Sequence, residues 1–225
     1  MLREYYEWYP SELAAESPAS QRPRRVLYPL AKRAFDIAVT LVLAPFALLL
    51  VGLLVLLIRL DGGPAFFAQP RLGKGGLTFR LWKLRTMVPD ADQRLQIYLN
   101  SNPAARAEWD LTQKLAVDPR TTKLGRWLRK YSIDELPQLY NVLRGDMSLV
   151  GPRPMLPEQR QYYPETAYFD MRPGLTGLWQ VNVRNDCSFA ERARHDTRYA
   201  LSMSFMTDIR ILLMTPAVVI RGTGL

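Results

Sequence analysis

The chain has 225 residues, enough for one domain with its own hydrophobic core and a small appendage. Thirty lysines and arginines against twenty-one aspartates and glutamates give a formal charge of +9, which favours anionic partners such as nucleic acid, acidic lipid head groups or phosphorylated substrates. With Cys187 as the only cysteine and His195 as the only histidine, the sequence excludes a disulfide framework, a zinc cluster and catalytic machinery that needs two histidines. Any catalytic chemistry must therefore depend on carboxylates, lysines and arginines.

Residues 1–30 predict a loosely ordered N-terminal tail. They contain four prolines and a cluster of aromatic residues, without helical or strand periodicity. The segment does not resemble a signal peptide, because its opening is acidic and the apolar run that follows comes too late and is too long.

An uncharged apolar run follows at Ile37–Ile58, and since about 20 apolar residues cross a bilayer, it is long enough to be a membrane segment. Pro45 lies inside the run and removes one helical hydrogen bond, so the helix should bend or break there. Basic residues flank both ends of the run, and positive flanks tend to stay in the cytoplasm. We therefore predict a re-entrant membrane helix over residues 31–60 that is broken at Pro45 and dips into one leaflet, with a spanning helix as the alternative.

The stretch after this run predicts a small β-hairpin. Residues 65–87 contain two short strand patterns joined by the glycine-rich turn Gly73–Gly76, and the second strand ends in Lys83, Arg85 and Thr86. The turn lacks the spacing of a phosphate-binding P-loop, which favours the hairpin interpretation.

Helical patterns dominate the rest of the chain. Residues 90–116 predict two surface or interfacial helices separated at Asn102–Pro103. The stretch DPRTTKLGRWLRKYS predicts a basic amphipathic helix, which either faces solvent or lies on the head-group plane beside the membrane segment. Residues 188–206 predict a further helix, and the apolar tail beyond it, too short and interrupted to span, suits core packing or interfacial docking. The predicted fold class is α+β and mostly helical.

The stretch Lys130–Pro154 carries the candidate chemistry. Ser132, followed three residues later by Glu135, fits a capping box, and Pro137 suits a first helical turn. On this motif alone, Asp134 and Glu135 could do nothing more than cap a helix.

The charges around the two carboxylates favour phosphoryl chemistry. Arg129 and Lys130 come just before them, and Arg153 lies between two prolines that restrict the backbone. Arginine forks bind phosphate oxygens, and a helix N-terminus adds amide donors for anions. Two adjacent carboxylates in such a setting could hold Mg²⁺, and one could attack phosphorus to form an aspartyl phosphate. Phosphoryl transfer needs mainly positioning and charge neutralisation, which these residues can provide without a histidine or a cysteine.

An ordered set of motifs resembles a known family. From about Lys32 to the C-terminus, the chain is similar to the catalytic domain of bacterial monotopic polyprenyl-phosphate phosphoglycosyl transferases, the bacterial sugar transferase family. The matching stretches are KRAFDI with the proline-broken apolar run, GPAFFAQPRLG, FRLWKLRTM, DPRTTKLGRWLRKYSIDELPQLYNVLRGDMSLVGPRP, and RPGLTGLWQV with the later helix. The resemblance covers most of the chain.

The resemblance implies a ping-pong transfer with a covalent intermediate. Asp134 would be the nucleophile that attacks the sugar-bearing phosphate of a UDP-sugar and expels UMP, and undecaprenyl phosphate would then accept the phosphosugar. Glu135 would be the partner carboxylate, either as a base or as an orienting group. Mg²⁺ would lie beside Asp134 and bridge the diphosphate.

Other positions of the family motifs imply supporting roles. Lys83, Arg85, Arg129 and Arg153 match basic positions and would neutralise phosphates. Asp196, in the late helix, matches an acidic position and would support the metal or the acceptor.

The resemblance also implies a location and partners. It makes residues 61–225 a catalytic domain, with interfacial helices, on the cytoplasmic face of the bacterial inner membrane, in contact with phospholipid and with a homodimer as one arrangement. The insertion at residues 90–116 favours UDP-galactose or UDP-glucose as the donor, for the first membrane step of exopolysaccharide or O-antigen assembly. The chain departs from the family pattern at Ala44, where serine is common, and at Asn182-Val183-Arg184, where hexose-type relatives often have Ser-Gly-Arg.

A membrane-anchored binding protein without catalysis is the alternative. Its basic surface would recognise anionic lipid or a partner, and Asp134 and Glu135 would only cap a helix. Nucleic-acid binding is not predicted, because the basic residues are distributed around an apolar hairpin and no known reader motif is present.

Overall fold

The computed structural model describes residues 22–112, 115–163, 166–182 and 189–222. Its first element is helix α2 (Arg22–Arg59). The predicted tail over residues 1–30 is therefore wrong at its C-terminal end, where the chain is already helical, and residues 1–21 lie outside the described residues.

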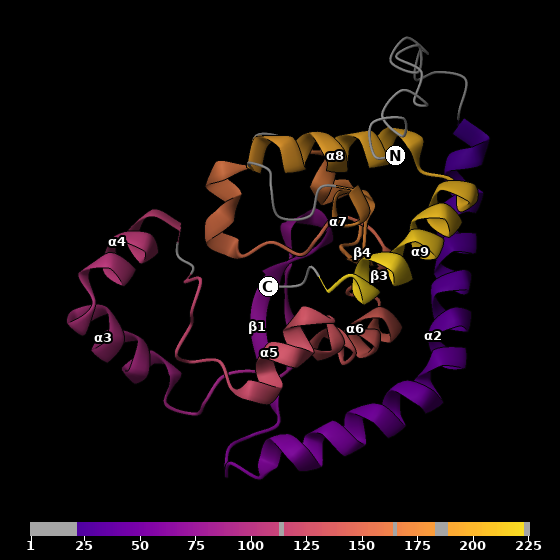
Figure 1. The fold of residues 1–225 in the computed structure, drawn as a ribbon. Helices are drawn as coiled ribbons and strands as arrows, with labels where there is room; N and C mark the ends of the chain where they lie inside the picture. The colour runs from indigo at the N-terminus through magenta and orange to yellow at the C-terminus, as the bar shows by residue number, and fades with distance from the viewer. Residues whose placement is uncertain (1–21, 113–114, 164–165, 183–188, 223–225) are drawn as a thin grey trace.

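Helix α2 contains Pro45 and remains helical through it. Its ribbon nevertheless changes direction sharply partway along its length (Figure 1). An interior proline removes a backbone hydrogen bond and clashes with the preceding turn, which kinks a helix without necessarily ending it. The predicted break is thus a bend within one continuous helix.

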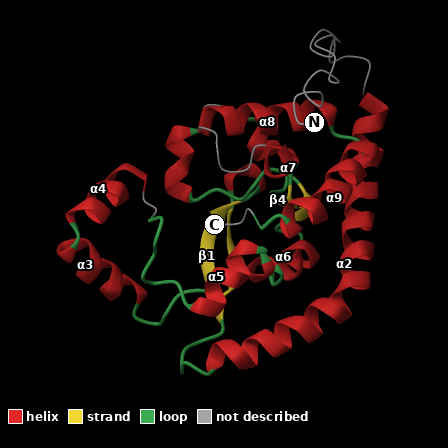
Figure 2. Ribbon diagram, in the orientation of Figure 1, coloured by secondary structure: helices red, strands yellow, loops and turns green. Residues whose placement is uncertain are grey.

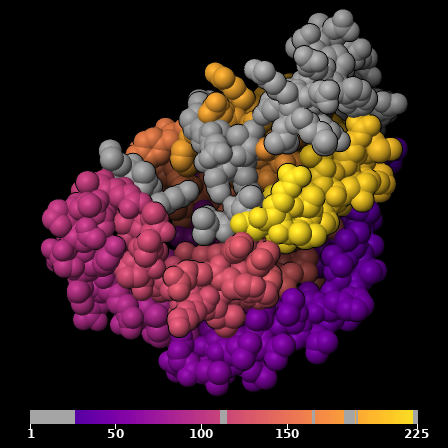
Figure 3. All heavy atoms as spheres, viewed as in Figure 1, coloured from indigo at the N-terminus to yellow at the C-terminus, as the bar shows by residue number. Residues whose placement is uncertain are grey.

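Much of the surface of α2 is apolar and exposed. By length and composition, α2 is the one helix among the described residues that could cross a membrane. Val42, Phe46 and Leu49 are 70%, 74% and 79% exposed, whereas Thr40 and Leu54 are buried against the body. In Figure 3 the atoms of α2 form the right and lower margin of the molecule.

Both ends of α2 are fixed to the same folded body. Near the N-terminal end, Arg33 donates a hydrogen bond of 2.8 Å to the carbonyl oxygen of Leu143. At the C-terminal end, Arg85 donates to the carbonyl oxygen of Ile58 at 3.1 Å and pairs with Asp61. Both ends of the helix therefore contact the same folded body.

Strands β1 (Phe66–Leu72) and β2 (Thr78–Leu84) confirm the predicted hairpin. They pair antiparallel, with Phe67 opposite Lys83. The connecting turn at Lys74–Gly76 contains two glycines with positive φ, a backbone conformation that glycine adopts without steric cost.

Helices α3 (Ala91–Ser101) and α4 (Pro103–Thr112) confirm the two helices predicted on either side of Asn102–Pro103. They share a small apolar cluster that includes Leu95 and Leu99. The two helices project from the rest of the body (Figure 1).

Helix α5 (Lys123–Lys130) is the predicted basic helix. Its N-terminus is capped by Thr122, whose hydroxyl accepts a hydrogen bond of 2.8 Å from the backbone nitrogen of Gly125. Leu128 is fully buried, while Trp127 is 48% exposed. One face therefore packs on the body and the other remains open.

The remaining elements complete the body. They are α6 (Gln138–Arg144), β3 (Ser148–Val150), β4 (Gly174–Thr176), α7 (Leu178–Asn182), α8 (Phe189–Ser202) and α9 (Phe205–Ile220). Strands β3 and β4 pair in parallel, and helices surround both small sheets (Figure 2). The helix predicted over residues 188–206 is confirmed as α8, although it ends at Ser202.

The main core lies between α2, α6, α9 and the two sheets. Val142, Met147, Tyr199 and Ile211 are at most 2% exposed and belong to one cluster. Ile211 shows that α9 packs into this core, while Leu213 on the same helix is 74% exposed. Each fully buried aliphatic side chain contributes about 1.5–3 kcal/mol of transfer free energy.

The segment after β3 packs against β4 without room for side chains. A Cβ on Gly174 would lie 2.1 Å from the backbone nitrogen of Gly151, and a Cβ on Gly151 would lie 2.3 Å from the carbonyl oxygen of Arg172. Gly151 also donates a hydrogen bond of 2.9 Å to Thr176. Glycine at both positions therefore fixes where the segment Gly151–Pro154 begins.

We expect Gly174→Ala to destabilise the fold by about 1–3 kcal/mol, because the added methyl group overpacks against the backbone of Gly151. The midpoint of thermal unfolding in detergent should fall by several degrees. Gly52→Ala is the matched control, since a Cβ there meets nothing within 4 Å and alanine is the better helix former. Equal midpoints for the two variants would contradict the packing argument.

Candidate active site

Asp134 and Glu135 lie in a 3₁₀ turn, Ile133–Glu135, between α5 and α6. The predicted capping box is wrong, because Ser132 makes no side-chain capping hydrogen bond and α6 begins only at Gln138. Among the described residues, Ser132 is the one non-glycine residue with positive φ, at 53°. Such a backbone conformation costs of order 1–3 kcal/mol and is often found at functional sites. It reverses the chain before the two carboxylates, so that they face the β-hairpin.

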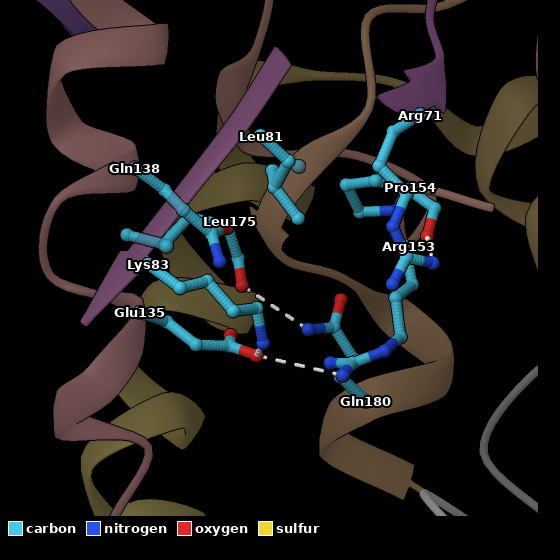
Figure 4. Close-up of a pocket in the computed structure, with 10 residues that line it drawn as sticks. Arg71, Leu81, Lys83, Glu135, Gln138, Arg153, Pro154, Leu175 and Gln180 are labelled. Atoms are coloured by element: carbon cyan, nitrogen blue, oxygen red, sulfur yellow. Dashed lines mark hydrogen bonds and ion pairs between the residues drawn. The ribbon is translucent and has the colours of Figure 1, made fainter. Parts of the chain in front are cut away.

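Lys83, on β2, lies between the two carboxylates. Its Nζ is 2.8 Å from Glu135 Oε1 and 3.5 Å from Asp134 Oδ2. Arg153 approaches from the opposite side, with Nη2 3.4 Å from the same Glu135 oxygen (Figure 4). Asp134 is only 5% exposed, whereas the Arg153 side chain is 36% exposed. Two carboxylates and two cations thus meet, with one carboxylate buried and one cation open to solvent.

Burial raises the pKa of the Asp134 carboxyl, and the neighbouring charge of Glu135 raises it further. Lys83 and Arg129 oppose this shift by stabilising the ionised form. Arg129 acts at longer range than Lys83, because its Nε donates a hydrogen bond of 2.8 Å to the hydroxyl of Thr86. The cations therefore reduce the upward shift, and burial still keeps the pKa of Asp134 above its ordinary value.

Two arginines, Arg192 buried and Arg71 partly buried, hold the segment that carries Arg153. Arg192, on α8, donates a hydrogen bond to the carbonyl oxygen of Arg153, and Arg71, on β1, donates one of 3.2 Å to that of Pro154. Burial lowers the pKa of Arg71 to about 10, so its guanidinium remains charged at neutral pH. Sequence reasoning missed both arginines, although Arg71 lies in one of the motifs that resemble the family.

Asp196, on α8, contacts Tyr163 and Arg192 rather than the paired carboxylates. It accepts a hydrogen bond of 2.6 Å from the hydroxyl of Tyr163, and its Oδ2 is 3.9 Å from Arg192 Nε. Burial raises its pKa to about 6. Through Arg192, Asp196 supports the carbonyl contact to Arg153, which differs from the role beside metal or acceptor that the sequence suggested.

Arg85 does not reach the carboxylates. Strand β2 ends at Leu84, so the alternation that places Lys83 does not extend to Arg85. Its guanidinium is held by Asp61 and the carbonyl oxygen of Ile58 at the end of α2. The structure therefore shows a structural contact for Arg85, and its contact with phosphate stays a prediction.

A small pocket, open to solvent, lies beside the ion pairs (Figure 4). The polar side chains in its wall come from β1, β2, the 3₁₀ turn, α6, α7 and the segment after β3; they are Arg71, Lys83, Glu135, Gln138, Arg153 and Gln180. Sequence reasoning missed both glutamines, although each lies in a motif that resembles the family.

The donor set fits Mg²⁺ only together with a substrate. The described residues contain no group of three or more histidine, cysteine, aspartate or glutamate side chains that could hold a metal. Asp134 and Glu135 supply two carboxylates, and Mg²⁺ is commonly held by one or two carboxylates plus substrate phosphates and water. Both carboxylates contact Lys83, so the amine would have to share them with a metal ion.

Comparison with known proteins gives consistent similarities. Exopolysaccharide production protein ExoY of Sinorhizobium fredii is 45% identical over 202 residues, which covers 86% of this chain and 88% of that protein. The undecaprenyl-phosphate galactose phosphotransferase of Salmonella typhimurium is 43% identical over 195 residues, and the undecaprenyl-phosphate glucose phosphotransferase of Komagataeibacter xylinus is 39% identical over 202 residues. These matches cover 86% and 83% of this chain but only 41% and 35% of the two phosphotransferases.

The family pattern described as bacterial sugar transferase matches residues 27–222, which is nearly the whole of the described chain. The match includes α2, both sheets and the turn that holds Asp134 and Glu135. The chain therefore belongs to the bacterial sugar transferase family and is a transferase.

Proposed function

We propose that the protein transfers a hexose 1-phosphate from a UDP-hexose to undecaprenyl phosphate and releases UMP. The observation that carries the proposal is the buried carboxylate of Asp134, which is paired with Lys83, a residue that lines the pocket together with Glu135 and Arg153. The names of similar proteins support both substrates, since two of them are undecaprenyl-phosphate galactose and glucose phosphotransferases. The non-catalytic binding protein is not favoured, because the chain belongs to a family of transferases.

In the first step, a carboxylate oxygen of Asp134 attacks the phosphorus that bears the hexose. The new O–P bond forms as the bond from that phosphorus to the bridging oxygen breaks, and its electron pair leaves with UMP. In the second step, a phosphate oxygen of undecaprenyl phosphate attacks the same phosphorus and the Asp134 carboxylate is released. One buried nucleophile can thus serve a soluble donor and a lipid acceptor in turn.

The charges in the pocket suit this chemistry. Lys83 and Arg153 lie where they can neutralise the phosphate oxygens as negative charge accumulates. Glu135 holds both cations at one edge of the pocket, which gives it an orienting role. Mg²⁺, when bound beside Asp134, would supply further charge neutralisation on the diphosphate.

We also propose that α2 is re-entrant and that the site faces the cytoplasm at the inner membrane. Support comes from the hydrogen bonds that tie Arg33 and Ile58, near opposite ends of α2, to one folded body. A spanning helix would place its ends on opposite sides of a hydrocarbon layer about 30 Å thick. The exposed apolar side chains of the bent helix suit contact with phospholipid in one leaflet.

We expect Asp134→Asn to lower UMP release from a UDP-hexose by more than about 10³-fold, because the amide cannot act as the nucleophile. In wild-type protein given donor without acceptor, intact mass should rise by one hexose phosphate, and the variant should show no rise. Asp92→Asn, at an exposed position on α3, is the matched control and should keep both signals. An unmodified wild-type mass under conditions that support turnover would rule out the covalent step.

The pH dependence of UMP release should report the ionisation of Asp134. Since Lys83 lowers the pKa of Asp134, Lys83→Met should raise that pKa, and the acid limb of the pH–rate profile should move to higher pH. Lys123→Met, at an exposed position on α5, should leave the limb in place. The comparison uses the position of the acid limb rather than the rate, because loss of phosphate neutralisation in Lys83→Met lowers the rate at every pH. An acid limb that does not move would contradict the assignment.

Cysteine labelling tests the topology. In a Cys187→Ser background, we expect cysteines introduced at Ser20 and at Leu77 to react with a membrane-impermeant maleimide from the same side, because both flanks of α2 would lie in the cytoplasm. Leu77 is 75% exposed in the hairpin turn, which makes it accessible to the reagent. Labelling from opposite sides would show a spanning helix instead.

A further inference from the structure

The side chain of Gln180, on α7, has an unused hydrogen-bonding group in the wall of the pocket. Gln180 is 9% exposed, and its Nε2 donates a hydrogen bond of 3.1 Å to the carbonyl oxygen of Leu175 (Figure 4). Its Oε1 is buried and has no hydrogen-bond partner among the described residues. A buried acceptor without a partner is costly, and native structures rarely leave one without a reason.

The orientation of this amide follows from its neighbour. The carbonyl oxygen of Leu175 can only accept a hydrogen bond, so the amide nitrogen of Gln180 must face it. A flipped amide would bring two acceptor oxygens together. The Gln180 oxygen is therefore the atom left to accept a hydrogen bond, and a pocket ligand that carries a donor would satisfy it.

The ionised phosphates of the two proposed substrates do not meet this need, because they offer only acceptor oxygens to an acceptor. The cations that suit phosphate, Lys83 and Arg153, line the same pocket. Undecaprenyl phosphate has neither a hydroxyl nor an N–H group. The hexose of the donor has several hydroxyls, and it is joined through one oxygen to the phosphorus that Asp134 attacks, whereas the ribose and the uracil lie beyond the second phosphate.

We propose that Gln180 Oε1 accepts a hydrogen bond from one hydroxyl of the hexose, which makes Gln180 a sugar-binding residue of the donor site. The inference rests on the proposed function. It assigns to Gln180 the selection between hexoses that present a hydroxyl at that point and hexoses that do not.

The test pairs a substitution with modified donors. UMP release is measured for wild type and Gln180→Met with the preferred UDP-hexose and with analogues that each lack one hexose hydroxyl. For one analogue, kcat/KM of the wild type should be about three- to tenfold lower than with the preferred donor, as expected for the loss of one hydrogen bond. For Gln180→Met, kcat/KM should be the same with that analogue as with the preferred donor. Because each ratio is taken within one variant, a general loss of stability cancels, and Gln180→Asn provides the same ratio if Gln180→Met does not fold.

Gln96→Met, at an exposed position on α3, is the matched control and should show the wild-type ratio with every analogue. Equal ratios in wild type and both Gln180 variants for all the analogues would overturn the inference. A changed ratio only with donors modified on the ribose or the uracil would also overturn it, in favour of a nucleoside contact. Absence of UMP release by wild type from every UDP-sugar would instead overturn the proposed function itself.

Discussion

The contact of Lys83 with both members of the Asp134–Glu135 pair is the constraint on which the site depends. Two adjacent carboxylates, one of them almost fully buried, repel each other and resist ionisation unless a cation lies between them. The cation comes from β2, so the hairpin must pack against the 3₁₀ turn. Asn141, fully buried on α6, secures this arrangement by accepting a hydrogen bond of 3.1 Å from the backbone nitrogen of Trp82. The fold around the turn can be understood as the support for that one ion-paired cluster.

The second cation, Arg153, is positioned in a different way. Arg153 is positioned through its backbone, since Arg71 and Arg192 donate to successive carbonyl oxygens and the close approach at Gly151 fixes where the segment begins. Its side chain is left more exposed than the acidic groups that it faces. On the proposed mechanism, a fixed backbone with a solvent-exposed guanidinium would allow the charge to follow a phosphate through both steps without moving the pocket wall.

Local patterns in the sequence were sufficient for much of the fold. The apolar run, the glycine turn of the hairpin and the helix boundary at Asn102–Pro103 depend on neighbouring residues, and the structure confirms them. The error before α6 involves contacts between distant segments. A left-handed backbone at Ser132 replaced the capping box, because tertiary packing decided the local conformation. The orphaned oxygen of Gln180 depends on where Leu175 lies in space, which no motif records.

The bent helix α2 has a consequence for the surroundings of the enzyme. If α2 is re-entrant as proposed, the depth at which it rests in the bilayer and the height of Asp134 relative to the lipid phosphates would be coupled, because Arg33 and Arg85 join the helix to the body. A thicker or thinner hydrocarbon layer changes how a helix of fixed apolar length settles, at a cost of fractions of a kcal/mol per Å. On the proposed topology, lipid composition would therefore tune turnover through the alignment of acceptor phosphate and nucleophile. On that topology, the length of the acyl chains in the host membrane would affect the geometry of the catalytic site.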